Sequence, residues 1–291
     1  MKTRKKLSDF AVFTGLFIFS IICLLPLVLA FMVSITDEGS IQRFGYSLIP
    51  AKFSLSAYST IFTQGALIFK SYMITIFVTV IGTLAAITIT GMAAYTLANK
   101  NVKYRNAMAL FIFIPMVFNL GIVPWYMICK MFGLRNNFAA LIIPSLLFSP
   151  FNFFLTRNFF MSIPDSLRES AKIDGAGDFR IAFQIYLPVV TPVLAAITLF
   201  YGLAYWNNWW NAIMLVDKPD LYPLQYLLLK IRTEIRMMEE IRGAVSIANM
   251  NLPTESLKMA TAMITIGPII LLYPYLQRYL VKGLTIGSVK G

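Results

Sequence analysis

SYMITIFVTVIGTLAAITITGMAAYTLA, residues Ser71 to Ala98, decides the fold class, because this stretch carries no charge and is long enough to cross a membrane as one helix. A bilayer core about 30 Å thick needs about 20 apolar helical residues. Working outward along the chain, other stretches meet the same requirement. The six predicted spans are Phe10–Val33, Ser71–Ala98, Ala107–Cys129, Phe138–Phe154, Leu187–Val216 and Leu257–Leu280.

The overall composition agrees with an all-α integral membrane protein. Of the 291 residues, 58% are hydrophobic and 13% are charged, and the mean hydropathy is +0.72. A soluble domain carries roughly 25% charged residues, so this chain lacks the charge that a water-exposed surface needs. The first apolar run is too long for the core of a signal peptide, so we expect it to remain as an uncleaved span.

The positions of Lys and Arg predict the orientation, because these residues resist translocation when they lie close to a span. Fourteen of them lie in four segments that the six spans place on the same side of the membrane. We therefore assign this side to the cytoplasm, and both termini lie there. Much of the net charge of +12 is accounted for by this topology, so it is weak evidence for nucleic-acid binding. The residues are Lys2, Arg4, Lys5, Lys6, Lys100, Lys103, Arg105, Arg157, Arg168, Lys172, Arg180, Arg278, Lys282 and Lys290.

Several kinds of chemistry are disfavoured by residues that the chain lacks. It has no histidine, and the apolar centres of the predicted spans contain no Asp or Glu. Histidine-based catalysis and a proton relay within the membrane are therefore not expected, which argues against a membrane-embedded hydrolase or protease. Cys23 and Cys129 both lie within predicted spans, and two cysteines alone do not make a structural zinc site. We predict neither catalytic residues nor metal ligands.

Proline and polar aromatic residues suggest a path through the spans. Prolines in the third to sixth spans favour kinks, which suit a transporter, although proline is in general commoner in membrane helices. The run Tyr205–Asn211 combines rings and amides that could contact a sugar, or could form an interfacial aromatic belt or pack internally. The candidate pathway residues are Asn119, Asn152, Tyr205, Trp206, Asn207, Asn208, Trp209 and Asn211.

The segment between the fourth and fifth spans predicts a helix–turn–helix outside the membrane. Ser162 is suited to be the N-cap of its first helix. Gly175 is suited to end that helix in a left-handed conformation, and Asp178 to cap a second short helix. Small side chains at Ser170 and Ala171 would permit close docking against a partner.

This segment resembles the EAA loop of ABC importer permeases. That loop has the pattern E-A-A, three residues, G, nine residues and I-x-L-P, and the chain matches it with Glu169-Ser-Ala171, Gly175 and Ile185-x-Leu-Pro188. Ser170 replaces the usual first alanine and keeps the side chain small. More widely, the chain is similar to the MalG-like carbohydrate-uptake permeases, and in its end, residues 281–291, to the LplC-type oligosaccharide permeases.

The resemblance implies a type I ABC importer permease fold (MetI-like) and a role in coupling. The EAA loop of the family is a coupling helix that sits in a cleft of a cytoplasmic ATPase. The implied partners are a second, homologous permease, two ATPase subunits that bind ATP and Mg, and an external solute-binding protein that delivers oligosaccharides. The residues implied to contact the ATPase are Glu169, Ser170, Ala171, Asp174, Gly175 and Ala176.

The predicted organisation is a cytoplasmic N-terminus (1–9), a six-span permease domain (10–282) and a cytoplasmic tail (283–291). The domain includes outer loops 34–70 and 217–256 and the EAA loop 161–186. The second outer loop predicts an amphipathic helix that rests on the bilayer or the spans, or faces the solute-binding protein. The rival functions are a permease for another solute class, such as amino acids or polyamines, and a structural or receptor membrane protein without transport.

Overall fold

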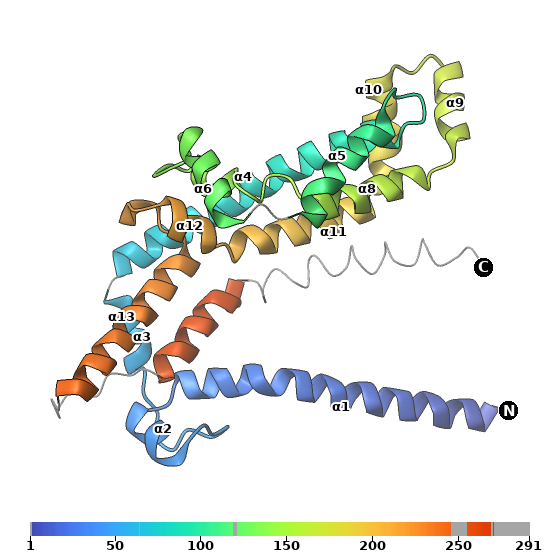
Figure 1. The fold of residues 1–291 in the computed structure, drawn as a ribbon. Helices are drawn as coiled ribbons and strands as arrows, with labels where there is room; N and C mark the ends of the chain where they lie inside the picture. The colour runs from blue at the N-terminus through green and yellow to red at the C-terminus, as the bar shows by residue number, and fades with distance from the viewer. Residues whose placement is uncertain (1, 64, 119–120, 246–254, 269, 271–291) are drawn as a thin grey trace. The chain divides into compact units, whose positions relative to one another are not determined.

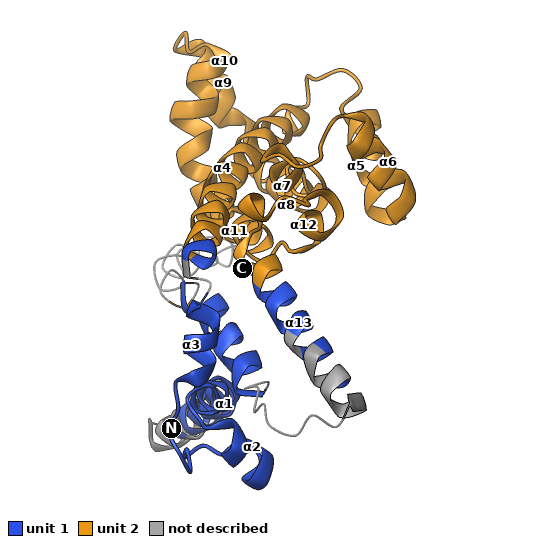
Figure 2. Cartoon of the chain, turned by 90° about the vertical axis from the view of Figure 1, so that its left-hand side faces the viewer, with its two compact units in different colours: residues 1–68, 228–269 blue, residues 69–227, 270–291 orange. Residues whose placement is uncertain are grey.

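The computed structural model describes residues 2–63, 65–118, 121–245, 255–268 and 270. Within these residues the backbone is helical apart from its loops, and Thr36 and Phe53 form an isolated antiparallel bridge (Figure 1). The chain divides into two compact units, residues 1–68 with 228–269 and residues 69–227 with 270–291 (Figure 2).

The first unit brings together the start of the sequence and a much later segment, residues 228–269. It contains α1 (Lys2–Ser34), α2 (Glu38–Phe44), α3 (Ser56–Phe62), most of α13 (Leu224–Val245) and a helix over residues 255–268. Most of α1 is exposed and apolar, as expected for a helix surrounded by lipid.

A buried carboxylate joins α2 to the helix over residues 255–268 within this unit. Glu38 is 5% exposed, and its carboxylate accepts hydrogen bonds from the backbone N–H groups of Glu255 and Ser256 at 3.0 Å and from Ser256 Oγ at 2.9 Å. These N–H groups open the helix over residues 255–268, so the negative charge also lies at the positive end of the helix dipole. Glu255 in turn accepts from Tyr46 and Lys258, which lower the pKa of its carboxyl group.

The second unit holds the helical elements of residues 69–227. They are α4 (Gly65–Ala98), α5 (Arg105–Val117), α6 (Ile122–Met131), α7 (Ala139–Ile142), α8 (Pro150–Met161), α9 (Asp165–Ile173), α10 (Asp178–Arg180), the π-helical segment η1 (Ile181–Tyr186), α11 (Leu187–Trp206), α12 (Trp210–Leu215) and the 3-10 turn η2 (Pro219–Leu221). The first residues of α4 and α13 belong to different units from the rest of those helices.

The described residues contain three helical stretches long and apolar enough to cross a membrane, Val12–Ser34, Ala66–Ala98 and Asp178–Trp206. The bent pair α5 and α6 makes a fourth if it counts as one span. The sixth predicted span, Leu257–Leu280, is helical over 257–268, and most of its remainder lies outside the described residues, as does the tail.

The fourth predicted span, Phe138–Phe154, is wrong as a continuous helix. α7 ends at Ile142, and α8 begins only at Pro150, with Ser149 as its N-cap. Pro144 and Pro150 each lack a backbone donor and clash with the preceding turn, so the intervening chain leaves the helix. Ser145 has a positive φ of 65° in this break.

The predicted amphipathic helix is present as α13, and its position on the outer side stays a prediction. Of its apolar stripe, Leu224, Leu227, Leu228 and Ile231 are buried, while Arg232 and Arg236 are exposed. Its first two turns therefore pack within the chain, as one of the two alternatives expected. The side chains of Ile235 and Met238 lie outside the described set.

Candidate functional site

The predicted helix–turn–helix is present as α9 and α10, joined by a tight turn. We call residues 165–180 the elbow. α9 is strongly amphipathic, with Ala171 buried and Glu169, Ser170 and Asp174 exposed. A turn closes its end, because Gly175 N–H donates to Lys172 O at 3.0 Å and Ala176 N–H donates to Ala171 O at 2.9 Å.

Gly175 ends α9 as the sequence predicts. Its φ is +78°, a left-handed conformation that glycine adopts without the steric penalty of a Cβ. No other atom of the chain lies within 4 Å of where a Cβ would stand, so the requirement for glycine here comes from backbone conformation and not from crowding.

Both N-cap predictions for the elbow are wrong. Ser162 belongs to the end of α8, where its Oγ donates to Phe159 O at 2.8 Å, and α9 begins after Pro164 without a side-chain cap. Pro164 has a fixed φ and supplies the extended entry to α9 itself. Asp178 lies in the first turn of α10 behind Gly177, and its carboxylate binds cations of α9 instead of capping.

One ion pair joins the elbow to the end of α4, and two more lie within the elbow. Lys100, which follows α4, contacts Asp165 at 2.5 Å, and Arg168 Nη2 donates to Asp178 Oδ1 at 3.0 Å. Lys172 Nζ lies 3.7 Å from the same Asp178 oxygen. The Arg168 side chain is only 17% exposed, so its pair with Asp178 is less screened by water than the Lys100 pair.

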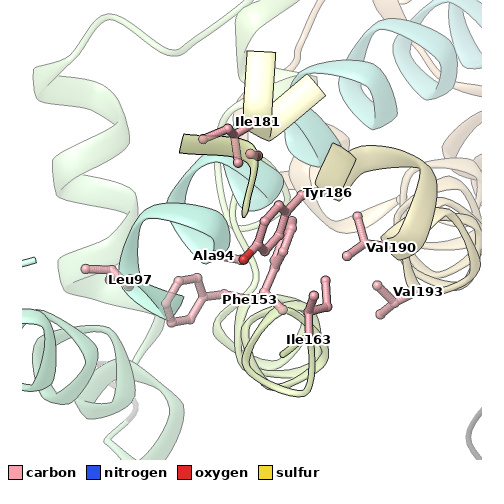
Figure 3. Close-up of a cluster of buried hydrophobic side chains, with 10 residues drawn as sticks. Ala94, Leu97, Phe153, Ile163, Ile181, Tyr186, Val190 and Val193 are labelled. Carbon is pink, nitrogen blue, oxygen red and sulfur yellow. The ribbon is translucent and has the colours of Figure 1, made fainter. Parts of the chain in front are cut away.

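A hydrophobic cluster connects the base of the elbow to α4, α8 and α11. Ala171 of α9 belongs to one cluster of buried side chains with Ile163, Phe160 of α8 and Tyr186 at the entry to α11, and Tyr95 of α4 packs against this cluster. Figure 3 shows Ile163 and Tyr186 among its members. The Tyr95, Phe160 and Tyr186 rings lie 5.5 to 6.2 Å apart. Because close-packed interiors deform little, a displacement of α9 is transmitted to α4, α8 and α11.

Replacing Ala171 by Leu tests this contact. Ala171 is 6% exposed, so the larger side chain should overpack the cluster at a cost of about 1–3 kcal/mol and force α9 away from the spans. We expect the transport that the EAA resemblance implies to fall several-fold while the amount of membrane-inserted protein stays near wild type. Ser170→Leu at the exposed neighbour is the matched control for stability, and equal loss of thermal stability in both variants would contradict the packing argument.

Two outward-facing side chains of the elbow were missed from the sequence. Ile173 is 86% exposed and Phe179 is 83% exposed, next to the exposed Glu169 and Asp174. Ile173 lies outside the candidate membrane spans, where an apolar side chain this exposed is available for contact with another protein. The helical stripe alone could have indicated Ile173, since it falls opposite the buried face.

The break in the fourth predicted span is held by side chains of α11 and α12. Tyr205 Oη donates to Ile142 O at 2.9 Å, and Asn211 Nδ2 donates to Pro144 O at 2.8 Å. Both carbonyls lost their helical partners where the helix stops, and in a membrane no water can replace them. Tyr205 and Asn211 are 2% and 1% exposed, so their hydrogen-bonding groups are used inside the chain.

Tyr201 completes this arrangement and borders a cavity. Its hydroxyl accepts from Ser149 N–H at 2.9 Å and shares a hydrogen bond with Thr90 Oγ1 at 2.7 Å, which joins α4, α8 and α11. The adjoining cavity has a volume of about 320 Å³ and is lined by Ser145, Ser149, Asn152 and Tyr201 among others. Asn152 is 5% exposed, and its side-chain amide has no hydrogen bond to another described residue.

The other predicted pathway residues have different surroundings. Trp206 is buried, Trp209 is exposed and stacks edge-on against Trp210, and Asn207 accepts from Gln225 at 3.1 Å. Asn208 Oδ1 accepts from Asn211 N–H, while its Nδ2 is buried without a partner among the described residues. Asn119 lies outside the described residues.

Polar side chains join the loop after α6 to the loop after α12. Asn136 Nδ2 and Arg135 Nη2 donate to Asp217 Oδ2 at 3.0 and 2.9 Å, and Asn136 Oδ1 accepts from Asp217 N–H at 2.6 Å. The hydrogen bonds from Asn136 and then Arg135 hold the pKa of the Asp217 carboxyl below its ordinary value. Asn136 itself has a φ of +54°, which asparagine tolerates better than most residues.

Comparison with known proteins agrees with these features. Residues 86–286 match the family model described as binding-protein-dependent transport system inner membrane component. The polygalacturonan/rhamnogalacturonan transport system permease protein YtcP of Bacillus subtilis is 34% identical over 99% of this chain and 100% of its own length. Protein LplC of the same organism is 34% identical over 93% of this chain and 90% of its own length.

A solved structure extends the similarity to three dimensions. A bacterial ABC transporter involved in the import of the acidic polysaccharide alginate contains a chain with a TM-score of 0.79 and 30% sequence identity. The alignment covers 94% of this chain and 96% of that chain.

The family match and these relatives show a permease subunit of an ABC importer, a transport subunit in which ATP hydrolysis is left to separate subunits. The chain belongs to the family of binding-protein-dependent transport system inner membrane components. It is therefore a membrane protein of the bacterial cell membrane, and the expected resemblance to carbohydrate-uptake permeases is confirmed.

Proposed function

We propose that this chain is the six-span half of a heterodimeric permease that imports oligosaccharides delivered by an external solute-binding protein. Both termini lie in the cytoplasm, and two ATPase subunits that bind ATP and Mg drive the cycle. The observation that carries the proposal is the elbow, because it matches the EAA spacing, carries an exposed apolar tip and rests on a cluster shared by α4, α8 and α11.

The elbow has two faces with different roles. Glu169, Ser170, Asp174 and Gly175 are exposed and form the ATPase contact, together with the apolar tip at Ile173. Ala171 and Ala176 were also expected at this contact, but they pack against the chain's own cluster. Their small size therefore serves to seat α9 close to the spans, so that nucleotide-driven movement of the ATPase reaches the cluster.

The substrate class is supported by relatives and by residue chemistry. The names of YtcP and of the alginate importer refer to polysaccharides that contain uronic acids, and AraQ of Bacillus subtilis, 25% identical over 97% of this chain, is named for arabinooligosaccharides. Amides and rings suit sugar hydroxyls and ring faces. Asn152 at the cavity and Asn208 have unused hydrogen-bonding groups, so among the predicted pathway residues they are the first to test.

Charging the tip of the elbow should weaken ATPase binding. Ile173→Glu places a carboxylate where the contact requires a desolvated apolar side chain, and a central hot-spot residue contributes about 2 kcal/mol or more. We expect the affinity of the purified permease for the ATPase to fall at least roughly tenfold, measured as the ATPase that co-purifies with it. Ser166→Glu adds the same charge in the first turn of α9, where the helix dipole favours it, and should retain the ATPase.

Uptake by cells or proteoliposomes containing the complete importer tests the substrate class. Radiolabelled neutral arabino-oligosaccharides and uronate-containing oligosaccharides are supplied in parallel with an amino acid and a polyamine. We expect ATP-dependent uptake of an oligosaccharide, lost in Ile173→Glu. Uptake of only the amino acid or the polyamine would show that the oligosaccharide assignment is wrong. A chain that never co-purifies with an ATPase would refute the coupling role.

A further inference from the structure

Two arginines near the start of α5 have no acidic partner among the residues that the structure describes. Arg105 is the first residue of α5, and its Nη1 is buried without a hydrogen-bond acceptor among the described residues. Arg157 of α8 donates from Nε to Leu97 O at 3.0 Å, and the two guanidinium groups repel each other. Neither forms an ion pair within the described ranges, where Asp165 and Asp178 are bound to other cations.

The helix terminus beside them adds to the positive potential. α5 has no acidic residue in its first turn, and its N-cap, Tyr104, supplies no side-chain acceptor. The N-terminus of a helix carries about half a positive charge, so a cation there is unfavourable and an anion is favoured. The positive potential near the N-terminus of α5 has three sources, which are the helix dipole, Arg105 and Arg157. All three favour a negatively charged group there.

An apolar groove has two wall residues that are linked to these arginines by a hydrogen bond or by sequence. It has a volume of about 610 Å³ and lies between the last two turns of α4 and the first turns of α5. Leu97, whose carbonyl binds Arg157, and Ala107, two residues after Arg105, are in its wall. Farther from the arginines the wall is apolar, with Met92 of α4 and Phe111 of α5 among its residues.

We propose that this groove binds an anionic phospholipid, with its headgroup phosphate at Arg105 and Arg157 and an acyl chain along α4 and α5. The ligand must be negative at one end and apolar at the other, and charge complementarity at the mouth favours a lipid over an uncharged helix of another subunit. Basic pockets between membrane helices are known to suit anionic headgroups. With both termini in the cytoplasm, as proposed above, the phospholipid comes from the inner leaflet of the membrane.

The sign of a stability change tests the proposal. The complete importer is placed in nanodiscs of phosphatidylcholine, with or without phosphatidylglycerol, and thermal unfolding and retained phosphatidylglycerol are measured. Without phosphatidylglycerol, Arg105→Gln should raise thermal stability, because it removes a partly buried charge that has no partner. With phosphatidylglycerol, the same variant should lower it, and affinity for the lipid should fall roughly five- to tenfold.

Matched controls separate lipid binding from a general effect of removing a positive charge. Lys103→Gln removes the same charge from the same loop, where Lys103 Nζ lies 5.1 Å from the Tyr104 ring, and should leave lipid retention unchanged. Inorganic phosphate in phosphatidylcholine nanodiscs should not reproduce the stabilisation. The proposal is overturned if Arg105→Gln raises stability equally in both lipids, or if it instead releases the second permease. Neither readout uses sugar uptake, so failure here leaves the proposed transport function untouched.

Discussion

An importer carrying Gly175→Pro should insert normally and lose substrate uptake. Proline fixes φ near −65°, whereas Gly175 has a φ of +78°, so the turn that ends α9 cannot form. The substitution also removes the N–H that binds Lys172 O and disfavours the helical conformation of Asp174 before it. The combined cost of roughly 3 kcal/mol or more falls on the elbow alone.

Gly177→Pro provides the matched control for this prediction. Gly177 has φ −69° and ψ 160°, which proline adopts, and the space around it is open. We expect this variant to transport at nearly the wild-type rate. Uptake and membrane content are measured together, and a Gly175→Pro importer that transports as well as Gly177→Pro would show that the turn has no part in coupling.

Glu38→Ala should produce the largest loss of stability outside the elbow. The change leaves two backbone N–H groups and the Ser256 hydroxyl without their acceptor, and Ser256 is completely buried. Unpaired buried donors and a lost charge at a helix terminus together cost about 3 kcal/mol. For a chain of this size we expect the thermal midpoint to fall by roughly 6–12 °C.

Asp37→Ala at the adjacent position is the control. Asp37 pairs with Lys52 at 3.5 Å, and the lysine side chain is 71% exposed, so this pair contributes about 0–1 kcal/mol. Thermal unfolding of both variants in the same detergent makes the comparison. If the two variants unfold at the same temperature, the buried carboxylate does not stabilise the first unit as the contacts indicate.

The sequence predicted best those features that depend on one local property. The uncharged run Ser71–Ala98 became the long helix α4, because hydropathy over a sufficient length determines a span. Gly175 was identified for the same reason, since only its own backbone conformation requires glycine. The N-cap at Ser162 failed because a capping residue depends on where the preceding helix ends, and α8 extends to Met161.

The candidate pathway shows why long-range contacts are harder to predict. Tyr205 and Asn211 have the rings and amides expected of a sugar contact, yet the same groups satisfy the carbonyls of Ile142 and Pro144. Those partners lie more than 60 residues away in the sequence, and the break that frees them depends on prolines in another segment. Residue chemistry alone does not distinguish a ligand from an unsatisfied backbone group.

The buried contact of Glu38 with Ser256 has a consequence for biosynthesis. The acceptor emerges early from the ribosome, whereas its donors are made only after residues 69–227 of the second unit have been translated. The first unit therefore cannot complete its fold until residues 255 and 256 have been made, and we expect a chain truncated before residue 255 to keep an unsatisfied carboxylate. Such a product would carry an incompletely folded first unit, so this contact reports that synthesis has passed Ser256.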